Sequence, residues 1–127
     1  MKGCRLLPHV VIKGGFSISD YGRIFLPLYE NEEWLIKIDE YFIERGGSKA
    51  LLPVVVVEEG HSQKFYVKIS ANEENHSFTI RLDPSTDPVK TIGVKRSLAL
   101  VTESILEKYK EATVVRHNLQ HLLNTPV

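Results

Sequence analysis

The chain has 127 residues, 43% hydrophobic and 25% charged, which is the length and composition of one ordinary globular domain. Its sixteen lysines and arginines balance sixteen aspartates and glutamates, and this zero net charge excludes a chain that binds polyanions through its overall charge. Affinity for nucleic acid therefore requires that basic side chains gather on one part of the surface.

Compartment and cofactors are constrained by what the sequence lacks. The single cysteine, Cys4, cannot form an intramolecular disulfide, which favours a reducing compartment. No apolar run approaches the roughly 20 residues that span a bilayer, and residues 1–13 lack the features of a secretory signal. We therefore expect a cytoplasmic protein with no membrane partner and no cofactor. The excess of Glu over Gln follows a bias of thermophilic proteins.

Two strands are predicted near the N-terminus. Residues 6–13 form an apolar run rich in β-branched side chains, and two glycines end it. Residues 23–29 alternate apolar and other side chains, which predicts a second strand. Pro8 and Pro27 favour edge positions for both strands, because proline has no N–H to donate to a neighbouring strand.

Residues 31–45 are predicted to form a helix. Asn31 is a good N-cap, and Trp34, Ile38 and Phe42 recur at helical spacing. A strand over residues 35–42 is the alternative, because part of the same run also fits a period of two. In the helical interpretation Ile36 lies away from Trp34, so the helix is apolar on two sides and indicates an interface.

Three consecutive antiparallel strands are predicted over residues 54–57, 64–69 and 77–82. Apolar side chains of the second and third strands point to one face. The residues that point to the opposite face include three cations and a tyrosine: Lys64, Tyr66, Lys68 and Arg81. Cations pair with phosphates and a tyrosine ring stacks on a base, so this face is the candidate nucleic-acid surface.

Two further helices are predicted, over residues 94–111 and 113–123. In the second helix His117 and His121 are four residues apart, a spacing at which one metal ion reaches both imidazoles. A third ligand cannot be placed from the sequence, so these histidines are only weak metal candidates and we expect no metal.

The segment before the long helix is a second candidate site. A helix N-terminus presents free N–H groups to an anion, and Gly93 allows a phosphate to approach closely. Lys95, Arg96 and Ser97 add charge and a hydroxyl group. An anion or phosphate site at Gly93, Lys95, Arg96 and Ser97 is therefore predicted, although the segment matches neither a P-loop nor a dinucleotide fingerprint.

Residues 19–27, Ser-Asp-Tyr-Gly-Arg-Ile-Phe-Leu-Pro, resemble the D-x-x-G-R-I-x-I-P signature of the AbrB/MraZ swapped-hairpin transcription regulators. The resemblance implies a dimer that binds DNA through a basic face, with Arg23 as the motif arginine. It covers about nine residues. The arginine-bearing helix and Gly-Asp turn of that family are absent, and an acidic segment follows instead.

Together these patterns predict one α+β domain over residues 1–127, with an antiparallel or mixed sheet of about five strands and two to three helices packed on one face. Three apolar helix faces exceed what one small sheet buries, which predicts a homodimer with contacts at Ile36, Ile43 and residues 115–122. We expect a non-catalytic interaction domain that contacts nucleic acid or a protein partner. A small enzyme or ligand-binding protein with the anion site is the alternative, and a structural subunit of a larger assembly is a third possibility.

Overall fold

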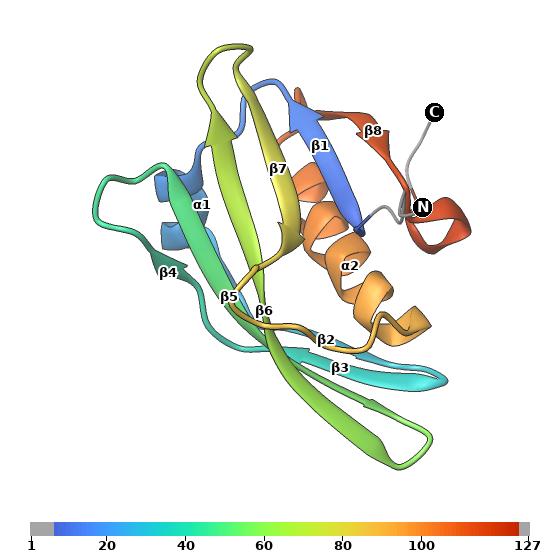
Figure 1. Ribbon diagram of the computed structural model, residues 1–127. Coiled ribbons are helices and arrows are strands. Elements are labelled where there is room, and N and C mark those ends of the chain that lie inside the picture. Colours follow the sequence, from blue (N-terminus) through green and yellow to red (C-terminus); the bar gives the residue numbers. More distant parts are fainter. Residues whose placement is uncertain (1–6, 125–127) are drawn as a thin grey trace, which may run out of the picture.

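The computed structural model describes residues 7–124, in which one antiparallel sheet curls around a long helix (Figure 1). Its eight strands are β1 (His9–Lys13), β2 (Leu28–Asn31), β3 (Trp34–Ile38), β4 (Phe42–Ile43), β5 (Lys49–Glu58), β6 (His61–Asn72), β7 (Ser77–Leu82) and β8 (Thr113–His117). The two α-helices of the described residues are α1 (Ile18–Ile24) and α2 (Ile92–Lys108), and a short 3-10 turn, η1 (Gln120–Leu122), follows β8.

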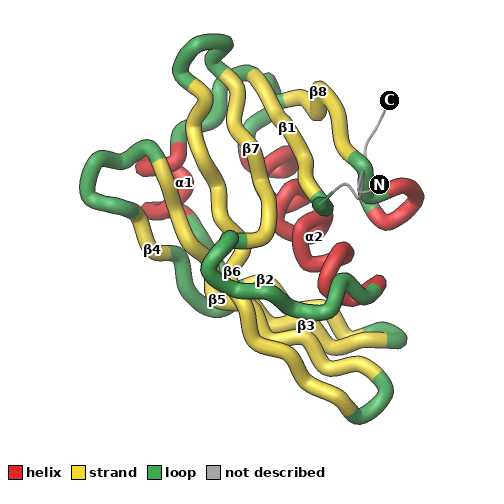
Figure 2. The backbone as a smooth tube through the Cα atoms, in the orientation of Figure 1, coloured by secondary structure: helices red, strands yellow, loops and turns green. Residues whose placement is uncertain are grey.

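The order of the strands across the sheet is β2-β3-β5-β6-β7-β1-β8, and β4 pairs with the first part of β5. The long strands β5 and β6 run through both halves of the sheet (Figure 2). At one end they pair with β2 and β3, and at the other β6 pairs with β7, beside which β1 and β8 lie. The sheet therefore forms a curled half-barrel whose concave side holds α2.

The core lies between α2 and the concave face of the sheet. Alternate residues of β5 are buried, and the buried side of α2 packs on this surface. Val54 and Val56 of β5 and Leu98 and Ile105 of α2 are at most 1% exposed. Full burial of one such side chain contributes roughly 1.5–3 kcal/mol to folding, so this packing is the main source of stability.

Pro53 lies inside the central strand β5, a position that proline rarely occupies. It falls between the segment of β5 that pairs with β4 and the segment that pairs with β3. Residues 39–41 interrupt the pairing on that side, so the proline sits where the ladder is already broken.

The predicted sheet of about five strands with helices on one face is wrong, because the fold is mostly sheet and has only two α-helices in its described part. The three-stranded meander and the helix over 94–111 are confirmed as β5, β6, β7 and α2. The errors arise where short apolar segments fit both helical and strand periods.

The largest error is the helix predicted over residues 31–45, where β3 and β4 lie instead. Ile36 and Ile38 are both fully buried, so the period of two describes the segment. Asn31 is no N-cap: it ends β2 at a tight turn, in which the Glu32 N–H donates to the Trp34 carbonyl over 2.8 Å. The alternative strand interpretation is therefore the better one.

Two smaller errors have the same cause. Residues 113–117 form β8 because the edge of β1 is open to pairing, and only η1 is helical in the segment predicted as a helix. Residues 18–24 form α1, whose N-cap Ser17 accepts a hydrogen bond from the Asp20 N–H over 3.1 Å, so the strand predicted over 23–29 is reduced to β2.

The described residues also bear on the membrane and N-terminal predictions. In residues 7–124 no helix has both the length and the apolar character needed to cross a membrane. Cys4 and the first residue of the strand predicted over 6–13 lie outside the described residues, and β1 begins at His9.

Candidate nucleic-acid interface

The predicted basic residues lie on the sheet surface turned away from α2, which we call the outer face. Residues 65, 67 and 69 of β6 point into the core, so Lys64, Tyr66 and Lys68 point outward. Arg81 is the direct partner of Lys68 on β7 and therefore shares its face. The described helices pack on the concave side or beside β4, so no helix covers these four residues.

Charge is segregated between the two faces of the sheet. At the outward positions of the described strands every charged side chain is basic, and His9 lies among them. These residues are Lys13, Lys37, Lys49, Lys64, Lys68, Arg81 and Arg116. The strand carboxylates Glu30 and Glu58 point inward instead. A neutral chain thus presents a basic face, which is what contact with a polyanion requires.

Lys68 and Arg81 are the centre of this face, because they are cross-strand neighbours of like charge. Such a pair destabilises a sheet by about 0.2–1 kcal/mol. Among residues 7–124 no carboxylate oxygen lies within 4.0 Å of either cation. Lys37 differs, since it lies 3.8 Å from Asp39. No ion pair in the described chain therefore offsets the repulsion of this pair, although Asp83 lines the hollows beside both cations.

Two polar atoms beside this pair are buried and have no hydrogen-bond partner within the described part of the chain: Nε of Arg81 and Oγ of Ser70. Ser70 is two residues from Lys68 on β6, and its cross-strand partner Thr79 is two residues from Arg81. The two atoms therefore belong to successive outward-facing residue pairs of β6 and β7, Lys68 with Arg81 and Ser70 with Thr79. Buried polar atoms without partners cost free energy, so both side chains would gain from an acceptor that reaches them.

Aromatic rings are interleaved with the cations. Tyr66 is 38% exposed and Phe42 is 54% exposed. Phe42 pairs with Leu51 of β5, and Leu51 pairs with Lys68 on its other side. Tyr29 of β2, opposite Lys37, is 61% exposed. A hollow of about 280 Å³ lies between Phe42 and Lys68. Exposed rings beside cations are the combination that single-stranded nucleic acids use, through stacking and phosphate pairing.

A second hollow, of about 500 Å³, lies beside Arg81 on the side of β1. His9, Thr79 and Lys90 contribute polar groups to its wall. Asp83 and Asp87 also line it, but Ser85 donates to the Asp83 carboxylate and Lys90 lies 2.7 Å from Asp87. The pairing with Lys90 lowers the pKa of Asp87, so that this carboxylate stays ionised and paired.

The predicted anion site at the start of α2 is occupied by a side chain of the protein. Thr91 caps the helix, and the Glu58 carboxylate accepts hydrogen bonds from the Gly93 N–H over 2.9 Å and from the Thr91 hydroxyl. A Cβ atom at Gly93 would lie 2.6 Å from Cδ of Glu58, so the glycine makes room for this carboxylate. An external phosphate would have to displace Glu58.

The other predicted members of that site are not directed at a ligand either. Lys95 is partly exposed, and Ser97 is fully buried and donates to the Val94 carbonyl over 2.6 Å. Arg96 is 9% exposed and binds Glu30 and Glu103 through paired hydrogen bonds of 2.6–3.0 Å. These bonds from Arg96 lower the pKa of Glu30, and they raise that of Arg96 itself.

His117 and His121 do not share a helix face, because His117 lies on β8 and His121 in η1. Nδ1 of His117 accepts a hydrogen bond from the Leu119 N–H over 3.0 Å. Within residues 7–124 no group of three or more His, Cys, Asp and Glu side chains is arranged to hold a metal ion.

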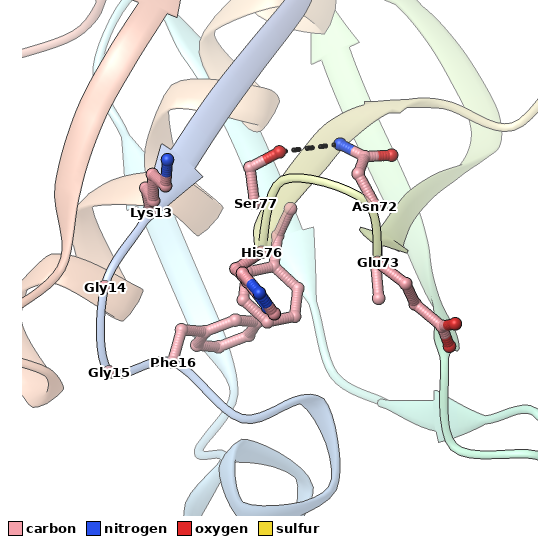
Figure 3. A pocket seen from close by; sticks show the side chains of 10 residues that line it. Lys13, Gly14, Gly15, Phe16, Asn72, Glu73, His76 and Ser77 are labelled. Carbon is pink, nitrogen blue, oxygen red and sulfur yellow. Dashed lines mark hydrogen bonds between the residues drawn. The ribbon is translucent and has the colours of Figure 1, made fainter.

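A third hollow, of about 570 Å³, lies where the loop after β1 meets the turn after β6 (Figure 3). Phe16 and Phe78 form its apolar wall, with ring centroids 4.9 Å apart. The Asn72 amide donates to Ser77 over 3.0 Å, and Ser77 donates to Asn75, so these three side chains bind one another. Lys13, Glu73 and His76 also line the hollow.

The segment that resembles the swapped-hairpin regulators is helical here. Arg23 lies near the end of α1 and pairs with Asp20 over 3.2 Å, so it is not placed on a hairpin strand as that resemblance implies. Of the predicted dimer contacts, Ile36 is fully buried within the chain, whereas Ile43 is 41% and Val115 52% exposed.

Comparison with known proteins does not add to this description: no protein-family model matches the chain, and no match was found among curated proteins or solved structures.

Sequence reasoning missed several members of the outer face. Lys49 and Arg116 join it through β5 and β8, and Phe42 joins it through β4, where the sequence pattern predicts a helix. Alternation within residues 49–57 is a signal for Lys49, because Ala50, Leu52 and Val54 mark the buried side. Arg116 depends on the pairing of β8 with β1, which no local pattern indicates.

Proposed function

We propose that this protein is a non-catalytic interaction domain that binds nucleic acid through its outer face. The observation that carries the proposal is the directly paired Lys68 and Arg81, two cations without a carboxylate within 4.0 Å in the described chain, on a face that no described helix covers. Phosphate oxygens relieve the repulsion of this pair and supply the acceptor that Nε of Arg81 lacks.

The surrounding cations extend the binding surface beyond one phosphate. Lys64 lies two residues from Tyr66 on the same strand, and Lys49 and Arg116 lie at the two ends of the row that contains Ser70. A chain of phosphates can contact several of these cations at once, and each contact releases counterions from the nucleic acid. Affinity then depends steeply on salt.

The alternative, a small enzyme or ligand-binding protein with an anion site at the start of α2, has less support. Glu58 supplies the anion for that helix N-terminus and Arg96 is paired with two carboxylates. The homodimer stays a prediction, which sedimentation of the intact chain checks. The dimer was predicted because three apolar helix faces exceed what one small sheet buries. That reason does not apply, since the described part of the fold has two α-helices.

The test is a mobility-shift titration of the intact protein with mixed single- and double-stranded DNA and RNA at low and moderate salt. We expect binding that is lost in Lys68→Glu. Lys110→Glu is the matched control, because Lys110 is exposed in the turn after α2 and its substitution changes the net charge equally. Absence of binding at low salt, or equal loss in both variants, would refute the proposal.

A further inference from the structure

We infer that the outer face selects single-stranded nucleic acid, with bases stacked on Phe42 and Tyr66 while phosphates pair with Lys68 and Arg81. This inference rests on the proposed function and names the class of nucleic acid. It follows from three features: the register that places rings beside cations, the hollow next to Phe42, and the curvature of the sheet.

The register places both rings near the cation pair, Phe42 along the row and Tyr66 along β6. Phe42 lies opposite Leu51, Leu51 opposite Lys68, and Lys68 opposite Arg81, in one row across four strands. Since neighbouring strands are about 4.8 Å apart, Phe42 begins about 10 Å from Lys68. Tyr66 is two residues from Lys68 along β6, about 7 Å away. A short stretch of single strand therefore contacts both rings and both cations.

The hollow of about 280 Å³ beside Phe42 has an apolar floor and a rim that carries charged side chains of both signs. Phe42 and Leu51 supply apolar surface, and Lys49 and Lys68 supply charge. Glu44 and Asp83 also border it, but the Asp83 carboxylate accepts a hydrogen bond from Ser85. A base fits such a place because its flat apolar surface covers the exposed ring while its phosphate meets a lysine.

Curvature argues against a duplex. The sheet curls around α2, so the outer face is convex (Figure 1). Bases in a duplex are stacked on each other and do not present their faces to a ring on a flat or convex surface. A single strand is flexible enough to follow the convex surface, and its bases are free to turn toward Phe42 and Tyr66.

The test compares three probes of equal length by fluorescence anisotropy: oligothymidylate, the same backbone with abasic residues, and a DNA duplex. The abasic probe keeps every phosphate and removes only the bases. We expect the intact protein to bind oligothymidylate about tenfold more tightly than the abasic probe, because stacking on a ring is worth roughly that much per base. The duplex should bind more weakly than oligothymidylate.

Variants locate the effect. Phe42→Ala and Tyr66→Ala should each weaken oligothymidylate binding about tenfold and leave abasic binding unchanged. Leu26→Ala is the control, because Leu26 is 65% exposed in the connection between α1 and β2, outside the strands of the outer face. Phe42→Leu keeps an apolar side chain for folding but has no ring, and it should behave as Phe42→Ala does.

The outcomes separate this inference from the proposed function. Equal affinity for oligothymidylate and the abasic probe would overturn base stacking while phosphate binding stands. Duplex binding as tight as oligothymidylate binding would overturn the selection of single strands. If no probe binds at low salt, the proposed function fails and the inference fails with it.

Discussion

Two arginines with limited exposure show how differently this molecule uses the same side chain. Arg96 donates to Glu30, to Glu103 and to the Leu122 carbonyl, and thereby ties β2, α2 and the C-terminal segment together. Arg81 has a buried Nε without a hydrogen-bond partner among residues 7–124, and one of its two direct cross-strand partners is Lys68, another cation. The charge of Arg96 is therefore paired inside the fold, whereas that of Arg81 has no ion-pair partner within the described residues.

The difference teaches that burial and charge alone do not identify a binding site. The sequence pattern singled out both arginines, Arg96 because it follows Lys95 at a helix N-terminus and Arg81 because strand alternation places it on the face of Lys68. Only the placement of carboxylates distinguishes them. Glu30 and Glu103 come from segments far from each other in the chain and meet at Arg96. Asp83 and Asp87 line the hollow beside Arg81, but no carboxylate of the described residues lies within 4.0 Å of its guanidinium.

The largest expected effect comes from removing Arg96, the arginine whose charge is paired inside the fold. Arg96→Met leaves the Glu30 and Glu103 carboxylates without their cation in a half-buried place, and should lower the free energy of unfolding by about 3–5 kcal/mol. Arg81→Met should not lower it, because the substitution removes a repelling charge and a donor without an acceptor. Urea unfolding of both variants at pH 7 measures this. Equal losses would contradict the distinction between the two arginines.

The next effect concerns Glu58 at the start of α2. Glu58→Ala removes the carboxylate that accepts from Gly93 and Thr91, and should cost about 1–2 kcal/mol, as the loss of a helix cap does. It also frees the helix N-terminus, so sulfate should stabilise this variant more than the parent protein. Glu73→Ala, in an exposed turn, is the control for thermal unfolding with and without sulfate. If sulfate stabilises both proteins equally, Glu58 does not block an anion site.

A smaller effect appears in the pH dependence of stability. Hydrogen bonds from Arg96 hold the pKa of Glu30 below its usual 4.5, so Glu30 stabilises the fold above that pH. The contribution is lost as pH falls from about 4.5 through the lower pKa of the folded protein. Urea midpoints at pH 7, 5 and 3.5 should fall less steeply in Glu30→Gln than in the parent. Parallel curves would show that Glu30 gains nothing from Arg96.

An alkaline effect is expected from Tyr21. Burial raises the pKa of Tyr21 to about 12, although its hydroxyl lies 2.6 Å from Oγ of Ser104. The unfolded chain therefore loses this proton near pH 10 and the folded chain does not, so stability should decline as pH rises from about 10 to 12. Tyr21→Phe should show a shallower decline in the same range. An unchanged decline would assign it to other groups.

The smallest expected effect concerns Arg81 and tests whether free phosphate binds to it. Inorganic phosphate, compared with sodium chloride at equal ionic strength, should raise the urea midpoint of the parent protein by a small margin. Part of this gain is general, because phosphate is excluded from protein surfaces. The part due to Arg81 should disappear in Arg81→Met. An identical gain in both proteins would mean that free phosphate does not bind at Arg81.

The sequence predicts those parts of the fold in which the spacing of apolar residues fits only one period, helical or strand. Phe65, Val67 and Ile69 alternate without ambiguity, and α2 repeats its apolar side over several turns. Residues 31–45 carry a pattern that fits both periods, and tertiary pairing with β5 decides for strands. β8 depends even more on its context, because it forms against an edge contributed by residues about 100 positions earlier.

The candidate site follows the same rule. Lys64, Tyr66, Lys68 and Arg81 come from unambiguous strands, and local alternation was enough to place them on one face. The anion site at Gly93 was predicted from a local feature of a helix N-terminus. Its occupant, Glu58, is 35 residues away in sequence, so only the folded chain reveals it.

The measurement that tests the central claim most directly is the salt dependence of oligothymidylate binding by the parent protein, Lys68→Glu and Lys110→Glu. We expect log K to fall linearly with log salt, and Lys68→Glu to flatten the slope by at least about 0.7, the share of one phosphate contact on a single strand. Lys110→Glu should keep the parent slope. The same slope in all three proteins would contradict an outer face that binds phosphates through Lys68 and Arg81.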